Sequence, residues 1–243
     1  DLLDGSPPCS SFSMAGNREK DWGKQKQFRE GQELQRLDDL VFEYIRTIKM
    51  LQPKVALLEN VKGLITGNAK AYAKEMKTQF EAAGYRVQVF LLNAASMGVP
   101  QKRERVFFIG LRKDLNAPLL KLAFNERPIT FGDVEDKTDF KEKEKNTKGY
   151  SLFTKTKEGE SFSKADKNSS FFGYSKVARL ETPNTIVSNS GTAQWHYSIF
   201  RQLNKNELCQ IGSYPLDYNF QDLEPKYLIG MSVPPVMTAQ IAH

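Results

Sequence analysis

Residues 54–60 read KVALLEN and give the first indication of the fold. Four consecutive apolar residues follow Lys54, and the run ends in the polar pair Glu59 and Asn60. A short apolar run bounded by a proline, here Pro53, is typical of a strand buried on both faces. Because functional groups gather at the carboxyl ends of strands in α/β sheets, the polar end marks a place to look for chemistry.

The segments around this strand alternate between helical and strand patterns. Residues 33–51 carry apolar side chains at intervals of three and four, which predicts a helix with one buried stripe. Residues 70–83 predict a second helix, with Gly84 in the capping position. Further strands are predicted at residues 1–5, 85–94 and 103–112. This order predicts an α/β sheet with helices on its faces.

The pattern changes between residues 119 and 198, where mixed charge, serine, threonine and isolated aromatics show no sustained helical period. This segment is either a solvated insertion or a small lobe of short strands and loops built for recognition. Order returns with a predicted helix that starts near Asn204 and has Glu207 at its third position, as in a capping box. The segment 230–243 predicts a loop entering a final helix.

Composition limits the classes of protein that the chain can belong to. Of 243 residues, 40% are hydrophobic and 26% charged, and no apolar run approaches the roughly 18 to 20 residues of a membrane span. Two cysteines and two histidines are too few for a disulfide framework or a structural zinc site, which favours a reducing, intracellular setting and no metal. The net charge of +6 is compatible with a polyanionic partner but does not establish one.

Five short motifs carry the chemistry when they are taken together. They are GSPPCSSFS at 5–13, ENV at 59–61, QKRER at 101–105, RQLNKNELCQIGSYP at 201–215 and GMSVPP at 230–235. In order and approximate spacing they resemble the DNA cytosine methyltransferases that form 5-methylcytosine. The resemblance covers nearly the whole chain apart from the variable lobe.

This resemblance implies a fold and a domain division. The expected fold is α/β, a Rossmann-like S-adenosylmethionine-dependent methyltransferase core with a small, mostly β or irregular target-recognition lobe. The expected division is a partial catalytic core at 1–118, the lobe and its connecting element at 119–220, and a segment returning to the core at 221–243. The first strands of the core, with the family's glycine-rich turn, are expected before Asp1, so the chain as given is expected to bind S-adenosylmethionine poorly.

The resemblance also implies the catalytic residues. Cys9 matches the nucleophile that attacks carbon 6 of cytosine, and the two prolines before it limit the entropy lost in holding the sulfur in place. Glu59 matches the acid that protonates ring nitrogen 3, which requires a raised pKa or a proton shared with the base. Arg105 is expected to meet the base, and Arg103 the nearby DNA backbone or an active-site partner.

The remaining site residues bind the two substrates. Residues 10–32 resemble the family's mobile loop, which closes over the flipped cytosine. The expected DNA contacts are Ser10, Ser13, Arg18, Gln101, Arg179 and Arg201. The expected contacts with the methyl donor are Pro7, Ser232 and Val233.

The sequence therefore predicts a DNA (cytosine-5) methyltransferase of a restriction-modification or phage type. It would transfer a methyl group from S-adenosylmethionine to carbon 5 of a flipped cytosine in duplex DNA, through a covalent cysteine adduct. A monomer in the cytoplasm of a bacterial cell is expected. Two alternatives remain, a DNA-binding relative without catalytic activity and an RNA cytosine methyltransferase.

Overall fold

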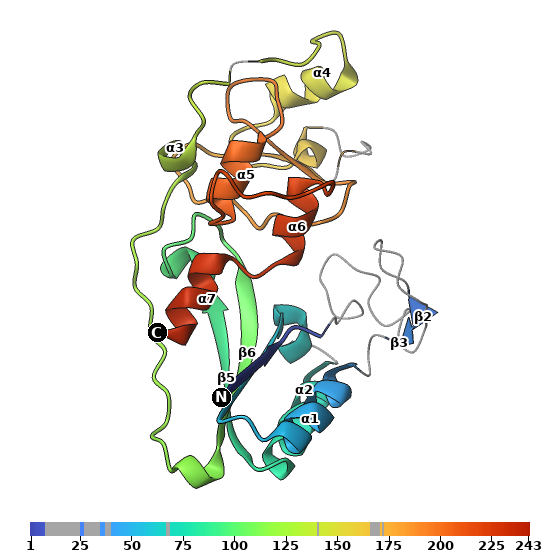
Figure 1. Ribbon diagram of the computed structural model, residues 1–243. Coiled ribbons are helices and arrows are strands. Elements are labelled where there is room, and N and C mark those ends of the chain that lie inside the picture. Colours follow the sequence, from blue (N-terminus) through green and yellow to red (C-terminus); the bar gives the residue numbers. More distant parts are fainter. Residues whose placement is uncertain are drawn as a thin grey trace. The chain divides into compact units, whose positions relative to one another are not determined.

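The structure, a computed structural model, describes most of the chain as two compact units (Figure 1). The described residues are 1–7, 25–26, 35–36, 40–66, 69–139, 141–165, 171 and 173–243, with the backbone alone at 25–26 and 35–36. The first unit contains residues 1–92 and 104–122, and the second contains residues 93–103 and 123–243. The chain therefore passes from one unit to the other inside the QKRER motif, between Arg103 and Glu104.

The first unit is built on a mixed sheet with strand order β1-β4-β6-β5. Its strands are β1 (Leu2–Gly5), β4 (Val55–Val61), β5 (Tyr85–Asn93) and β6 (Glu104–Arg112). β1 runs parallel to β4, and β4 runs antiparallel to β6. A separate antiparallel pair joins β2 (Gln25–Lys26) to β3 (Gln35–Arg36). The apolar run of KVALLEN thus forms a central strand of the sheet, as its composition predicts.

Two helices pack on the same side of this sheet (Figure 1). They are α1 (Leu40–Leu51) and α2 (Lys70–Ala82), with the short helices η1 (Lys62–Ile65) and η4 (Lys113–Leu115) after β4 and β6. Val41, Ile48 and Phe80 bury their side chains completely against the sheet residue Leu58. Burying one such side chain stabilises the fold by about 1.5–3 kcal/mol.

Tyr44 of α1 attaches the helix to strands β1 and β4. Its hydroxyl lies 3.0 Å from the carbonyl oxygen of Leu3 and 2.9 Å from that of Leu57, and burial raises its pKa. Its ring covers Gly5, where a Cβ atom would lie only 2.7 Å from the ring. Glycine at this position therefore lets α1 approach the carboxyl end of β1.

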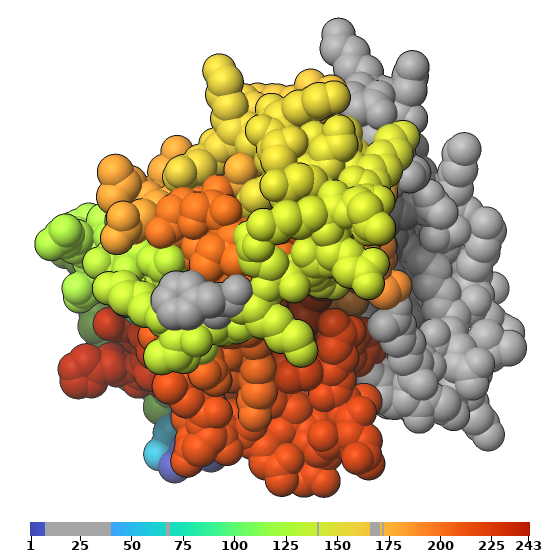
Figure 2. Space-filling view, turned by 90° about the horizontal axis from the view of Figure 1, so that it is seen from above, coloured from blue at the N-terminus to red at the C-terminus, as the bar shows by residue number. Residues whose placement is uncertain are grey.

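The second unit consists of short elements joined by loops. Its helices are η3 (Ala94–Ser96), α3 (Phe131–Val134), α4 (Lys148–Lys155), η5 (Phe162–Lys164), α5 (Lys205–Ile211), α6 (Pro225–Met231) and α7 (Pro235–Ala242). β7 (Tyr174–Lys176) and β8 (Ala193–Trp195) form a two-stranded parallel sheet. Figure 2 looks onto this unit and shows the yellow α4 segment and orange segments that follow it in the sequence on one face.

Two apolar clusters hold these elements together. One lies between α3, α5 and α6 and contains Phe131, Ile211 and Ile229. The other is aromatic, and in it Trp195 stacks on Phe200 with ring centroids 4.8 Å apart. Because the residues of each cluster come from distant parts of the sequence, the lobe has an apolar interior without an extended sheet.

Most of the predicted elements are confirmed, with two corrections. The helix predicted at 33–51 begins only at Leu40, because residues 35–36 are the strand that pairs with β2. The segment 119–198, where no helical period was found, contains the eight-residue helix α4. Asn204 and Glu207 form the predicted capping box of α5, and Gly84 has a positive φ of 102° at the end of α2.

Candidate active site

The carboxyl ends of β1 and β4 bring two of the sequence motifs together. The parallel register pairs Gly5 with Leu58, so the residues after Gly5 lie beside the polar end of β4. The side-chain amide of Asn60 donates a hydrogen bond to the carbonyl oxygen of Pro7 at 3.1 Å, and its oxygen accepts one from the N–H of Val61 at 2.8 Å. Asn60 is buried, so it ties the segment that leads to Cys9 to the end of β4.

Cys9 lies outside the described residues, as do Ser10, Ser13 and Arg18. Pro7 is described, and it is half-buried. The described part of this segment therefore ends at Pro7, two residues before the cysteine.

Glu59 and Arg105 form an ion pair beside Asn60. The antiparallel register pairs Val61 with Arg105 and Glu59 with Phe107, so Glu59 and Arg105 are diagonal neighbours on adjacent strands. Nε of Arg105 lies 2.9 Å from Oε1 of Glu59, with 15% and 14% of the two side chains exposed. Burial lowers the pKa of Arg105, and the adjacent carboxylate opposes this shift. A carboxylate and a guanidinium thus share a partly open position where β4 ends.

The other two polar residues of QKRER are enclosed in the second unit. Gln101 is fully buried; its amide donates to the carbonyl oxygen of Ile211, and its oxygen accepts the N–H of Ile186. Arg103 is 1% exposed and donates to the carbonyl oxygens of Ile186, Gly230 and Ser232 at 2.8–2.9 Å. These bonds join QKRER to the GMSVPP motif. Contact of Gln101 or Arg103 with DNA would require their release from this interior.

Arg201 is also part of the interior rather than of a surface. It is 3% exposed, and its two terminal nitrogens each lie 2.7 Å from a carboxylate oxygen of Glu207. The burial that makes this bidentate pair strong also keeps the guanidinium away from a ligand. This burial suits a structural role in holding the lobe's connecting element, and contact of Arg201 with DNA would require its release from the pair.

The remaining predicted residues of the second unit keep exposed surface. The side chain of Arg179 is 53% exposed. Ser232 and Val233 follow α6 and are half-buried. The hydroxyl of Ser232 donates to the carbonyl oxygen of Ile229 at 3.1 Å, and its own carbonyl accepts from Arg103. Their backbone is thus fixed while their side chains remain partly accessible.

Two features were not found from the sequence. Lys62 bridges to Glu104 at 2.8 Å next to the Glu59–Arg105 pair. Glu135 and His196 meet at 3.0 Å in the second unit although 61 residues separate them. Neither partner stands in a recognisable pattern with the other, so no local signal in the sequence could have revealed the pairing.

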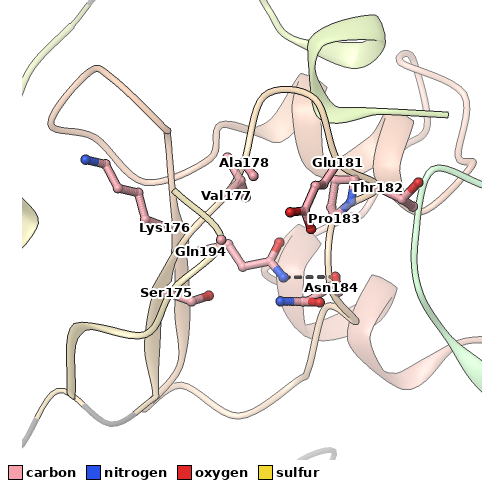
Figure 3. A pocket seen from close by; sticks show the side chains of 10 residues that line it. Ser175, Lys176, Val177, Ala178, Glu181, Thr182, Pro183, Asn184 and Gln194 are labelled. Carbon is pink, nitrogen blue, oxygen red and sulfur yellow. Dashed lines mark hydrogen bonds between the residues drawn. The ribbon is translucent and has the colours of Figure 1, made fainter. Parts of the chain in front are cut away.

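A shallow pocket in the second unit lies between β7, β8 and the segment around Asn184 (Figure 3). Its volume of about 10 Å³ has room for no more than about one water molecule. The side-chain amide of Gln194 crosses it and donates to the carbonyl oxygen of Asn184 at 2.9 Å. A pocket of this size cannot hold a nucleotide or a methyl donor.

The described residues contain no candidate metal site and no candidate membrane span. In the part of the chain that the structure describes, no three His, Cys, Asp or Glu side chains gather as metal ligands do. No helix among the described residues has the length and hydrophobicity to cross a bilayer.

The fold is that of an α/β methyltransferase core. It superposes with a TM-score of 0.70 on a crystal structure named as a DNA modification methyltransferase encoded within an E. coli prophage. At 18% identity the match covers 99% of this chain and 77% of that chain. Such a match defines the class of fold and leaves the reaction open.

Sequence comparison identifies the family. The profile of the family described as C-5 cytosine-specific DNA methylase matches residues 1–243. The type II methyltransferase M.FnuDI of Fusobacterium nucleatum is 30% identical over 96% of this chain and 73% of its own length. M1.HphI of Haemophilus parahaemolyticus, also a type II methyltransferase, is 30% identical over 100% of this chain and 67% of its own length. The chain belongs to the C-5 cytosine-specific DNA methylase family.

Proposed function

We propose that this chain acts as a DNA (cytosine-5) methyltransferase of the restriction-modification or phage type. It transfers a methyl group from S-adenosylmethionine to carbon 5 of a cytosine turned out of duplex DNA. The observation that supports this function best is the Glu59–Arg105 pair, at 2.9 Å, beside the Asn60 bond to the segment that leads to Cys9. Residues of three of the sequence motifs, among them Pro7, Glu59 and Arg105, are thus linked by contacts at one end of β4.

The reaction needs a nucleophile because carbon 5 of cytosine is too weak to take a methyl group directly. The thiolate of Cys9 adds to carbon 6 while ring nitrogen 3 takes a proton, and the ring becomes an enamine. Carbon 5 then takes the methyl group from the sulfonium donor, which leaves as a thioether. Loss of the carbon 5 proton to a base restores the double bond and expels the thiolate, and ring nitrogen 3 returns its proton to the carboxylate that donated it.

Glu59 and Arg105 are proposed to act on the two polar edges of the base. Glu59 donates the proton to ring nitrogen 3, and Arg105 donates a hydrogen bond to the adjacent carbonyl oxygen. A guanidinium at 2.9 Å favours the charged carboxylate, so Glu59 has to take up a proton from solvent before it protonates ring nitrogen 3. The remaining exposure of both side chains leaves surface that the base can cover.

The methyl donor is proposed to contact Pro7, Ser232 and Val233. All three residues are half-buried, so each keeps surface that a ligand can cover. Pro7 and Val233 present apolar surface, which suits the hydrocarbon and purine parts of S-adenosylmethionine. Bound there, the donor would supply an electrophilic methyl group.

Covalent trapping tests the proposal. The complete encoded protein is expected to form a stable adduct with DNA that contains 5-fluorocytosine, because fluorine at carbon 5 blocks the final elimination. Cys9→Ala is expected to abolish the adduct in a denaturing gel. An adduct that persists in this variant would refute the assignment of Cys9.

Glu59→Gln tests the acid in the same protein. We expect kcat to fall by about 10²- to 10⁴-fold, the usual contribution of a positioned proton donor. Glu160→Gln is the matched control because Glu160 also pairs with a cation, Lys164 at 2.9 Å, and its half-buried side chain lies in the second unit. Equal rates for the two variants would exclude Glu59 as the acid.

A further inference from the structure

A buried polar cluster in the second unit has no part in the chemistry described above. The carboxylate of Glu135 follows α3, its side chain is 10% exposed, and Oε1 faces Nε2 of His196 at 3.0 Å and the hydroxyl of Tyr197 at 3.1 Å. Nδ1 of His196 accepts the N–H groups of Ser198 and Ile199 at 3.2 and 3.1 Å. That nitrogen therefore carries no proton in the neutral ring, and Nε2–H donates to Glu135.

The second carboxylate oxygen of Glu135 faces an arginine at the surface. Nε of Arg179 lies 3.9 Å from Oε2, and the guanidinium carbon lies 5.8 Å from the centre of the Tyr197 ring. The Arg179 side chain is nevertheless 53% exposed. One edge of the guanidinium thus faces a fixed carboxylate and an aromatic ring, while the rest reaches solvent.

The backbone of Arg179 is held as well. Its N–H donates to Oε2 of Glu158 at 3.0 Å, and its carbonyl oxygen accepts the N–H of Gly132 at 2.8 Å. A Cβ on residue 132 would lie 3.1 Å from this oxygen and 3.2 Å from Cγ of Arg179. Glycine at this position therefore allows α3 to press against the arginine.

Stability alone does not explain the cluster. An ion pair at 3.9 Å with an exposed arginine stabilises a protein by about 0–1 kcal/mol. Burying a carboxylate and a histidine adds little to the stability of a fold, because apolar side chains of similar volume often stabilise it as well. The cluster does restrict the orientation of one guanidinium, which lowers the entropy lost when that group binds a ligand.

We propose that Arg179 contacts DNA through the outer edge of its guanidinium and that Glu135 and Tyr197 are positioning residues for it. This inference rests on the proposed function, because it takes DNA as the substrate. The planar fork of donors matches either a phosphate or the N7 and O6 atoms of guanine. Among the described residues no hydrogen bond from the Arg179 side chain occupies these donors.

Steady-state kinetics and DNA binding with the complete encoded protein test the contact. Arg179→Ala is expected to raise Kd and KM for DNA by about 5- to 140-fold, the range for one well-placed arginine contact, and to leave kcat within about twofold. Arg46→Ala is the matched control because Arg46 forms an exposed ion pair with Glu43 on α1 of the first unit. Unchanged Kd and KM in Arg179→Ala would overturn the proposal.

A double-mutant cycle tests the positioning role. Glu135→Gln and Tyr197→Phe are expected to raise KM for DNA several-fold when Arg179 is present and to have no further effect in the Arg179→Ala background. Effects that add fully in that background would show that the cluster supports the fold and not Arg179. Glu160→Gln again serves as the control for the loss of one carboxylate.

Salt and sequence dependence identify which part of DNA is contacted. Loss of a phosphate contact is expected to weaken all sequences equally and to reduce the slope of log Kd against log salt by about 0.9. Loss of a base contact is expected to relax discrimination at one position of the target. If the proposed function is wrong, the unaltered protein will form no Cys9 adduct. The DNA-binding measurements with the Arg179 variants can still be interpreted in that case.

Discussion

The two units each contain an arginine–glutamate pair, and the two pairs differ in what surrounds them. In the first unit Arg105 and Glu59 meet at 2.9 Å with 15% and 14% of their side chains exposed. In the second unit Arg201 and Glu207 form two bonds of 2.7 Å with 4% and 0% exposed. The same pair of side chains can therefore stay partly open at a strand end or be closed inside a lobe.

The surroundings of Glu207 explain why its pair is closed. Besides Arg201, the carboxylate accepts the N–H groups of Asn204 at 3.0 Å and Asp136 at 3.3 Å. It thereby caps α5 and fixes the segment after α3 at the same time. No exposed edge remains on either partner, whereas the pair in the first unit keeps one.

Removing Glu207 is expected to have the largest effect on stability. Glu207→Ala removes the bidentate partner of the buried Arg201 and, among the described residues, leaves only Asp139, at 3.9 Å, so we expect a loss of about 3–5 kcal/mol in the free energy of unfolding. Glu59→Ala should cost clearly less, because water can reach Arg105. Urea unfolding of both variants measures the difference, and equal losses would break the contrast between the pairs.

Local chemistry explains which parts of the fold could be predicted from the sequence. The strand at 55–61 follows from a short apolar run, and the capping box of α5 follows from Asn204 and Glu207 at the required spacing. Each of these signals lies within a few residues of the element that it defines. The start of α1 was misplaced because apolar spacing continues back to Leu34, whereas residues 35–36 pair with a strand ten residues earlier.

The two arginines of QKRER could not be told apart in the same way. Alternate positions on a strand would place Arg103 and Arg105 on one face, but β6 begins only at Glu104. Arg103 instead donates to backbone oxygens between 83 and 129 residues away. A role that depends on such distant partners leaves no pattern near the residue itself.

Gly230→Ala in the second unit is expected to have the next largest effect on stability. A Cβ on Gly230 would lie 2.4 Å from the backbone nitrogen of Ser188, so Gly230→Ala forces α6 away from that segment. We expect a loss of about 1–3 kcal/mol, typical of overpacking. Gly149→Ala in α4 is the control, because a Cβ on Gly149 would lie 3.7 Å from the nearest side chain among the described residues. The free energy of unfolding of this variant should rise by up to about 1 kcal/mol.

Thermal unfolding of the two glycine variants gives the answer directly. The melting temperature should fall for Gly230→Ala and stay level or rise for Gly149→Ala. Similar shifts for both would mean that the contact between α6 and residues 187–188 is not tight in solution.

The smallest expected effect is a pH dependence of the free energy of unfolding, caused by His196 of the second unit. Burial and the nearby Arg201 lower the pKa of His196, although its bond to Glu135 acts in the opposite direction. The unfolded chain therefore binds a proton more readily than the folded chain below the ordinary histidine value of about 6.5. Stability from this group is complete above that pH and declines as the pH falls below it.

Urea unfolding at pH 7.5 and pH 5.5 measures this decline. Carboxylates with lowered pKa values, such as Asp136 with a pKa of about 2, do not interfere with this measurement. Their contribution to stability is lost only at more acidic pH. His196→Asn should remove most of the difference between the two pH values, since asparagine does not titrate. If the free energy of unfolding fell by the same amount in the variant, titration of His196 would not be the cause of the decline.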